Sequence, residues 1–187
     1  VGGSSCLPLE NGFLSLTAEA WVDVDQFEVA VQSLKTSDHP TPADYQQALG
    51  LYSGDLLPED LYEDWALQRR ESLRNSYLGL LQDLSRIEEE HGNHAGAIAV
   101  LQRLLATDRG NETAHVGLMR LYALSGERQQ ALRQYHTLRE VLQTELETEP
   151  DLSADLLYQA IRDGNYPPGD SAGMFPMQAR VQAHTSG

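Results

Sequence analysis

The sequence has 187 residues, of which 28 are acidic and 13 are basic, so its formal net charge is −15. A chain this acidic repels phosphate backbones and anionic lipid, which argues against direct binding of nucleic acid or of a membrane surface. No run approaches the roughly 18 apolar residues that a membrane span needs. The single cysteine, Cys6, cannot form an internal disulfide. We therefore expect a cytoplasmic protein.

The N-terminal part of the chain contains a loose start and two short helices. Residues 1–20 are rich in glycine and serine and indicate a linker with at most one short strand near Phe13. A first amphipathic helix is expected after Asp25, and the segment TSDHPTP ends it. A second helix restarts at PADYQQALG and is expected to stop at Gly54.

A long helix is expected from about Asp60 to Glu90, because this stretch has no proline and a single glycine, Gly79. Its apolar residues recur at spacings of three and four, with charged residues on the opposite side. Glycines and one proline separate four further helices, expected at roughly 94–107, 111–124, 127–145 and 151–162.

The distribution of these elements predicts one helical domain. Strand signals are nearly absent, so the fold class is all-α. The helical domain is expected to span residues 21–162. Residues 163–187 contain proline, glycine and serine without a period, which is typical of a flexible tail or linker.

Two segments of the chain correspond at a fixed interval. The segment HGNHAGAIAVLQRLL begins at His91, and the segment SGERQQALRQYHTLR, which has glycine, alanine and leucine at matching positions, begins 34 residues later at Ser125. This is the period of the tetratricopeptide motif, in which two antiparallel helices form a unit and stack on the next unit. Gly92 and Gly126 occupy the turn between the helices, where a positive φ is often needed. The sequence therefore predicts a tetratricopeptide-like stack of antiparallel helix pairs with a long central helix.

No motif in the sequence frames a catalytic or metal site. Phosphate-binding glycine loops and nucleophile motifs are absent. Cys6 has no histidine near it, and His91 and His94 flank a glycine without further ligands, so we interpret both histidines as solvated turn residues. We predict a non-enzymatic protein with no cofactor. A helical enzyme whose site is divided among helices is the weakest hypothesis.

Helical repeats usually present a concave surface to a partner, and the first helix of each unit lines it. The partner-binding residues predicted on this basis are Gln82, Arg86 and Glu89 from one unit and Val116, Arg120 and Ala123 from the next. Arg86 and Arg120 are one repeat apart, so together they are suited to hold a carboxylate of a partner. The alternative is that both arginines are solvated, or paired with acids such as Glu89.

Several phrases spread over the chain carry a family resemblance. They are WVDVDQFE (21–28), ALGLYSGDLLPE (48–59), DWALQRRESLR (64–74), the segment 91–150 and LYQAI (157–161). Together they resemble the bacterial transcriptional activator domain, which is found in the antibiotic-regulatory-protein type of activator and in larger regulators. A small departure is Leu146-Glu147, where the family often has Leu-Gly before Glu-Pro.

The resemblance implies a role in transcription control without catalytic residues. It makes residues 1–20 the linker from, or the remnant of, an upstream DNA-binding domain. It implies protein partners: the DNA-binding domain of the same protein, a second copy in a homodimer, or the transcription machinery. The alternative is a helical-repeat adaptor that binds a peptide or protein outside transcription.

Overall fold

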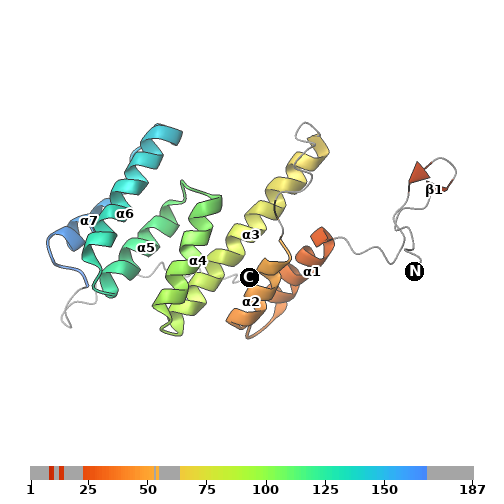
Figure 1. Cartoon of the computed structure of the whole chain (residues 1–187), viewed down its shortest axis with the longest axis horizontal. Coiled ribbons are helices and arrows are strands. Elements are labelled where there is room, and N and C mark those ends of the chain that lie inside the picture. Colours follow the sequence, from red (N-terminus) through yellow and green to blue (C-terminus); the bar gives the residue numbers. More distant parts are fainter. Residues whose placement is uncertain (1–8, 11–12, 15–22, 53, 55–63, 168–187) are drawn as a thin grey trace, which may run out of the picture. The chain divides into compact units, whose positions relative to one another are not determined.

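The computed structural model describes residues 9–10, 13–14, 23–52, 54 and 64–167. These residues form seven α-helices, one π-helical turn and one two-stranded ribbon (Figure 1), which confirms the all-α class. None of the helices in these ranges is long and apolar enough to cross a membrane. The chain divides into two compact units, residues 1–114 and 115–187.

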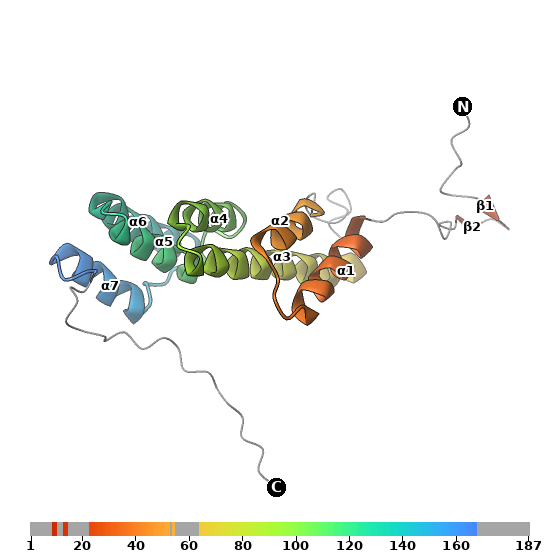
Figure 2. The same cartoon turned by 90° about the horizontal axis from the view of Figure 1, so that it is seen from below.

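The N-terminal unit is built around one long helix. Its elements are β1 (Leu9–Glu10), β2 (Phe13–Leu14), α1 (Asp23–Thr36), α2 (Pro42–Gly50), α3 (Asp64–Glu90) and α4 (His94–Thr107). The two strands pair antiparallel, so a short strand at Phe13 is confirmed. Helices α1, α2 and α4 all contact α3 (Figure 2). The helix at 94–107 has its predicted bounds.

The two short helices differ from expectation at single residues. Asp25 lies inside α1 instead of capping it, because α1 begins at Asp23. Helix α2 begins with a capping box, in which the Asp44 carboxylate accepts the Thr41 N–H at 2.8 Å. The hydrogen bond that the Thr41 hydroxyl donates to this carboxylate at 2.7 Å, and then the one from the Thr41 N–H, lower the pKa of Asp44. The helix ends at Gly50, a poor helix former, before it reaches Gly54.

An arginine and three aromatic rings link the helices of this unit. Tyr52 stacks on Tyr77 of α3 with a centroid distance of 4.4 Å and lies 5.4 Å from Phe27 of α1. Arg103 of α4 donates from Nε to the Tyr77 hydroxyl at 2.7 Å, and from its terminal nitrogen to the Leu49 carbonyl at 3.3 Å. Side chains from α1, α3 and α4 and the backbone of α2 therefore meet at one place.

The two corresponding segments, which begin at His91 and at Ser125, form the same turn. Gly92 has a φ of 75° and Gly126 a φ of 79°. The residue after each glycine donates its N–H to a carbonyl five residues back, Asn93 to Glu88 at 2.8 Å and Glu127 to Tyr122 at 2.7 Å. This is the bond of a Schellman motif, for which glycine is the favoured residue. Ala97 and Ala131 are both fully buried. The predicted register of the repeat is confirmed.

The C-terminal unit contains the second helix pair and a further helix. Its elements are α5 (Glu112–Leu124, which begins at the boundary between the units), α6 (Arg128–Val141), the π-helical turn η1 (Leu142–Leu146) and α7 (Leu152–Arg162). The expected helix at 127–145 therefore changes form at its end. The Thr144 hydroxyl bonds back to the Glu140 carbonyl at 2.7 Å, a contact that perturbs helices.

Helix α7 packs on α6 through an apolar cluster and an aromatic pair. Leu138, Leu142 and Ala154 form the buried cluster. Tyr135 stacks on Tyr158 at 4.2 Å and donates its hydroxyl to Asp155 at 2.6 Å. Loss of solvation, and then this hydrogen bond, raise the pKa of Tyr135 to about 12.

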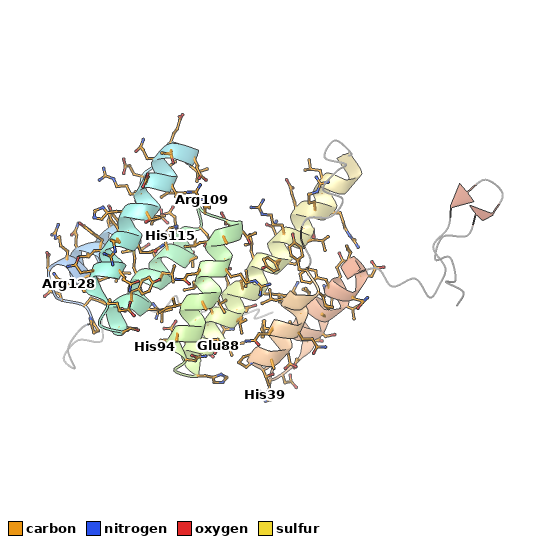
Figure 3. All side chains as sticks on the ribbon, in the orientation of Figure 1. His39, Glu88, His94, Arg109, His115 and Arg128 are labelled. Atoms are coloured by element: carbon orange, nitrogen blue, oxygen red, sulfur yellow. The ribbon has the colours of Figure 1, made fainter. Side chains whose placement is uncertain are left out.

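One side-chain contact and one backbone turn lie at the helix ends of this unit. Arg128, at the start of α6 (Figure 3), donates from Nε to the Ile161 carbonyl at 2.8 Å and so satisfies the end of α7. After η1 the chain turns at Glu147, which has a φ of 54° and a ψ of 33°. The Thr148 N–H closes that turn on the Leu142 carbonyl at 3.2 Å.

Candidate partner-binding site

An open groove of about 610 Å³ runs along α3 in the N-terminal unit, where α1 and α2 pack beside it. Its floor is apolar and consists of the buried side chains of Val31, Leu34, Tyr45 and Leu80. These residues come from three helices, because each amphipathic helix turns one apolar face toward the others. The groove is therefore a product of the packing of α1, α2 and α3.

The α3 wall of the groove is polar and sparsely filled. Its residues recur every three or four positions and include Gln68, Glu71, Ser72, Asn75, Ser76, Gly79 and Asp83. A Cβ atom at Gly79 would meet no atom within 4 Å, so the groove is open beside it. Apolar floors with polar walls are typical of surfaces that bind a partner.

Lys35 distinguishes this groove from the rest of the molecule. It is the only lysine in the sequence, and it lines both this groove and a second one, of about 770 Å³, along α1. Among residues 23–52, 54 and 64–167 it has no ion-pair or hydrogen-bond partner. The same holds for Glu71. The groove thus offers one cation and one carboxylate to a bound partner.

Three of the predicted partner-binding residues lie on α3. Gln82 and Arg86 are exposed and Glu89 is half-buried. Arg86 is paired along its own helix, at 2.8 Å with Glu90 and 3.7 Å with Asp83. The hydrogen bond with Glu90 is the main cause of the raised pKa of Arg86. Arg86 is therefore paired with acidic residues, as the alternative interpretation predicted, but its partners are Glu90 and Asp83 and not Glu89.

Arg86 does not line the groove, but its charge acts on Tyr45 in the groove floor. Burial and the Asp83 carboxylate raise the pKa of Tyr45, whereas Arg86 lowers it. Because Tyr45 belongs to the groove floor and Asp83 to its wall, the Arg86 guanidinium lies within electrostatic reach of both.

The other three predicted residues lie on α5, in the C-terminal unit. Val116 and Arg120 are half-buried, whereas Ala123 is buried and its carbonyl accepts the Gly126 N–H at 3.1 Å. The joint use of Arg86 and Arg120 on one surface stays a prediction. The burial of Ala123 leaves its side chain little area to offer a partner.

Two buried ionisable side chains outside the groove, Glu88 and His115, have structural partners. Glu88 is buried and accepts from the Asn93 amide at 2.7 Å, and Figure 3 shows it where α3 turns into α4. His115 is buried and lies 2.7 Å from the Gln134 amide. Within the part of the chain that the structure describes, no group of three His, Cys, Asp or Glu residues could hold a metal ion. Cys6 lies outside that part.

Residues 22–162 match the family described as bacterial transcriptional activator domain. The chain belongs to this family. The match covers most of the sequence and includes all the helices from α1 to α7. The resemblance predicted from the sequence is thereby confirmed.

Among solved structures, the activator domain is similar to the C-terminal TPR-containing domain of a putative FK506-binding protein of Plasmodium falciparum. The two are 14% identical, the likeness covers 76% of this chain and 89% of the other, and the TM-score is 0.48. No curated protein matches the chain.

The groove was not predicted from the sequence of the activator domain. Lys35 and Glu71 are 36 residues apart, and no local pattern connects them. The one available signal was compositional. A single lysine in a chain with 12 arginines is unusual, and this lysine follows an otherwise apolar face of α1.

Proposed function

We propose that this chain is the non-enzymatic protein-interaction domain of a bacterial transcriptional activator, and that it acts through the α1–α3 groove. The observation that carries the proposal is the family match over residues 22–162. The activator family favours a role in transcription over that of a general helical-repeat adaptor. In this proposal a DNA-binding domain of the same cytoplasmic protein reads the promoter, and the groove contacts a protein partner.

The charge pattern supports a protein partner rather than DNA. The net charge of −15 repels the phosphate backbone, and a groove with both Lys35 and Glu71 presents no continuous positive surface. A segment of protein can supply both a carboxylate for Lys35 and a polar or basic group for Glu71. The apolar floor would then bury the segment's apolar side chains.

The proposal is tested by Lys35→Glu in the full-length activator, with transcription from its promoter and promoter occupancy measured in parallel. Loss of one charge-assisted contact is expected to cost about 1.5–3 kcal/mol of partner binding, so activation should fall by about tenfold or more. Promoter occupancy should stay unchanged, because the groove does not contact DNA.

The matched control is Arg133→Glu on α6. Arg133 is exposed, and within residues 64–167 its guanidinium has no partner, so the control makes the same charge change away from the groove. Its activation should equal that of the wild type. Equal activation by the Lys35→Glu and Arg133→Glu variants would contradict the proposal that the groove binds the partner. Loss of promoter occupancy in the Lys35→Glu variant would contradict the proposal that the groove acts separately from DNA binding.

A further inference from the structure

Three polar side chains line both of the grooves beside α1 and α3. Lys35 of α1 and Ser72 and Ser76 of α3 belong to the groove of about 610 Å³ and also to the groove of about 770 Å³. Ser72 and Ser76 are four residues apart, so their side chains lie on the same face of α3. One ammonium group and two hydroxyl groups are therefore presented to whatever binds along these grooves.

All three side chains have free hydrogen-bond donors. In the part of the chain that the structure describes, none of them has a hydrogen-bond or ion-pair partner. Ser33 of α1 differs, because its hydroxyl donates to the Val29 carbonyl of its own helix at 2.9 Å. The donors of Ser72 and Ser76 are thus left for a ligand. An ammonium and two hydroxyls together are suited to bind an anionic group with several oxygen acceptors.

The charges around these residues favour a carboxylate over a phosphate. Glu71 lines the first groove, and Asp25 and Glu28 line the second. Asp25 and Glu28 share one guanidinium, that of Arg69, at 3.8 and 2.8 Å, so this group of three keeps a negative charge. A phosphate group carries a charge of about −1.5 to −2 at pH 7, whereas a carboxylate carries a single charge. The surrounding acids therefore repel a carboxylate less.

Both grooves continue well past the three shared side chains. The first extends along α3 to Asp83, seven residues after Ser76. The second extends along α1 to Glu28, seven residues before Lys35. At a rise of 1.5 Å per residue, each extension is about 10 Å long. A segment that follows both grooves continues on either side of the bound carboxylate, so this carboxylate belongs to a side chain and not to the end of a chain.

We propose that Lys35, Ser72 and Ser76 bind the carboxylate of an aspartate or glutamate side chain within an internal segment of the partner protein. The inference rests on the proposed function, because it names the group that the α1–α3 groove recognises. The Lys35 ammonium supplies the opposite charge, and the two serine hydroxyls donate to the carboxylate oxygens. The apolar floor of the first groove then contacts the residues next to this acid in the partner.

The test uses the position of Lys35 as the only lysine in the sequence. A carbodiimide joins an amine and a carboxylate that are in contact through an amide bond. The full-length activator is treated with a water-soluble carbodiimide in an extract that supports transcription from its promoter, and the peptides joined to Lys35 are identified by mass spectrometry. We expect an aspartate or glutamate from the interior of a partner chain. Lys35→Arg should remove this cross-link, because a guanidinium stays protonated and is not coupled.

A charge exchange then tests whether the cross-linked acid is the one recognised. Replacing that acid of the partner by lysine should raise the activation of the Lys35→Glu variant by about tenfold, because the opposite charges are restored with their positions exchanged. The same replacement with the wild-type activator should lower activation, because it places two ammonium groups together. Failure of the exchange to raise activation would overturn the assignment of this acid to Lys35.

The serines are tested by a double substitution. Ser72→Ala with Ser76→Ala should lower activation by about tenfold, because two hydrogen bonds to a charged group are lost. Alanine is the strongest helix former, so α3 should keep its structure, which circular dichroism checks. The matched control is Ser125→Ala with Ser153→Ala, which removes two exposed hydroxyls from the C-terminal unit and should leave activation unchanged. Equal activation by the two double variants would remove the serines from the site.

The outcomes separate this inference from the proposed function. A cross-link of Lys35 to the C-terminal carboxylate of a partner, a cross-link only to an acid of its own chain, or no cross-link would overturn the inference. In each case reduced activation by Lys35→Glu would still support the groove as a binding site. Equal activation by Lys35→Glu and Arg133→Glu would contradict the proposed function itself, whatever Lys35 is joined to.

Discussion

The turn after η1 places a glutamate where glycine would be more stable. Glu147 has a left-handed backbone conformation, with a φ of 54°, and the Cβ atom of an L-residue is crowded there. The activator family often has glycine at this position. The Glu147 side chain is exposed and, within residues 64–167, has no ion-pair or hydrogen-bond partner. The substitution Glu147→Gly should therefore relieve backbone strain without loss of a contact.

The net gain follows from two opposing backbone effects. A residue other than glycine in this conformation costs about 1–2 kcal/mol. Glycine also gives the unfolded chain more freedom, which subtracts about 0.5–1 kcal/mol. Taken at their midpoints, these two effects raise the free energy of unfolding by about 0.75 kcal/mol. For a domain of this size the corresponding increase in Tm is about 1–4 °C.

The assay is urea and thermal denaturation of the full chain, followed by circular dichroism. The control is Glu147→Ala, which removes the same charge and side chain but keeps the Cβ atom. Its stability should lie within about 0.5 kcal/mol of the wild type, as for most surface substitutions. If the alanine variant gains as much as the glycine variant, charge repulsion and not backbone strain is responsible. If neither gains, Glu147 carries no strain.

Three further predictions concern packing and charge. Gly79→Ala should raise the free energy of unfolding by about 0.5–1 kcal/mol, because the added Cβ atom would meet no atom within 4 Å. Gly96→Ala should lower the free energy of unfolding, because the added Cβ atom would overlap the Asn93 side chain that caps α4. Ala97→Leu and Ala131→Leu, at fully buried sites, should each destabilise by roughly 1–3 kcal/mol, and unchanged melting of both would contradict the repeat register. The isolated chain, with its charge of −15, should show no sequence-specific gel shift with duplex DNA at about 150 mM salt.

The parts of the fold that depend on local sequence could be predicted. Helical spacing gives the number and order of the helices, and the repeated glycine gives the turns at Gly92 and Gly126, because a positive φ favours one residue type there. The end of α6 could not be predicted, since the apolar spacing of the sequence does not distinguish a π-helical turn from an α-helical one. The start of α1 was predicted two residues too late, because α1 begins at Asp23 and not after Asp25.

The candidate site was harder to predict than the fold. Arg86 was predicted as a partner-binding residue because Arg120 lies one repeat later. The repeat does not predict the ion pair of Arg86 with Glu90 on the same helix. Lys35 was missed because it becomes part of a groove only when α1 packs on α3, a contact between segments far apart in the chain. Periodicity shows which face of a helix is buried, and it does not show which polar residues on different helices come together.

The contacts of Arg103 determine how the groove can move. This side chain joins α4 to the Tyr77 ring and to the Leu49 carbonyl, and Tyr77 continues the contact through Tyr52 to Phe27. A separation of α1 from α3 would break the contact of Phe27 with Tyr52, and a separation of α2 would break the hydrogen bond of Arg103 to the Leu49 carbonyl. We expect these helices to unfold as one cooperative unit. A partner would then meet a preformed groove and would lose little free energy in ordering it.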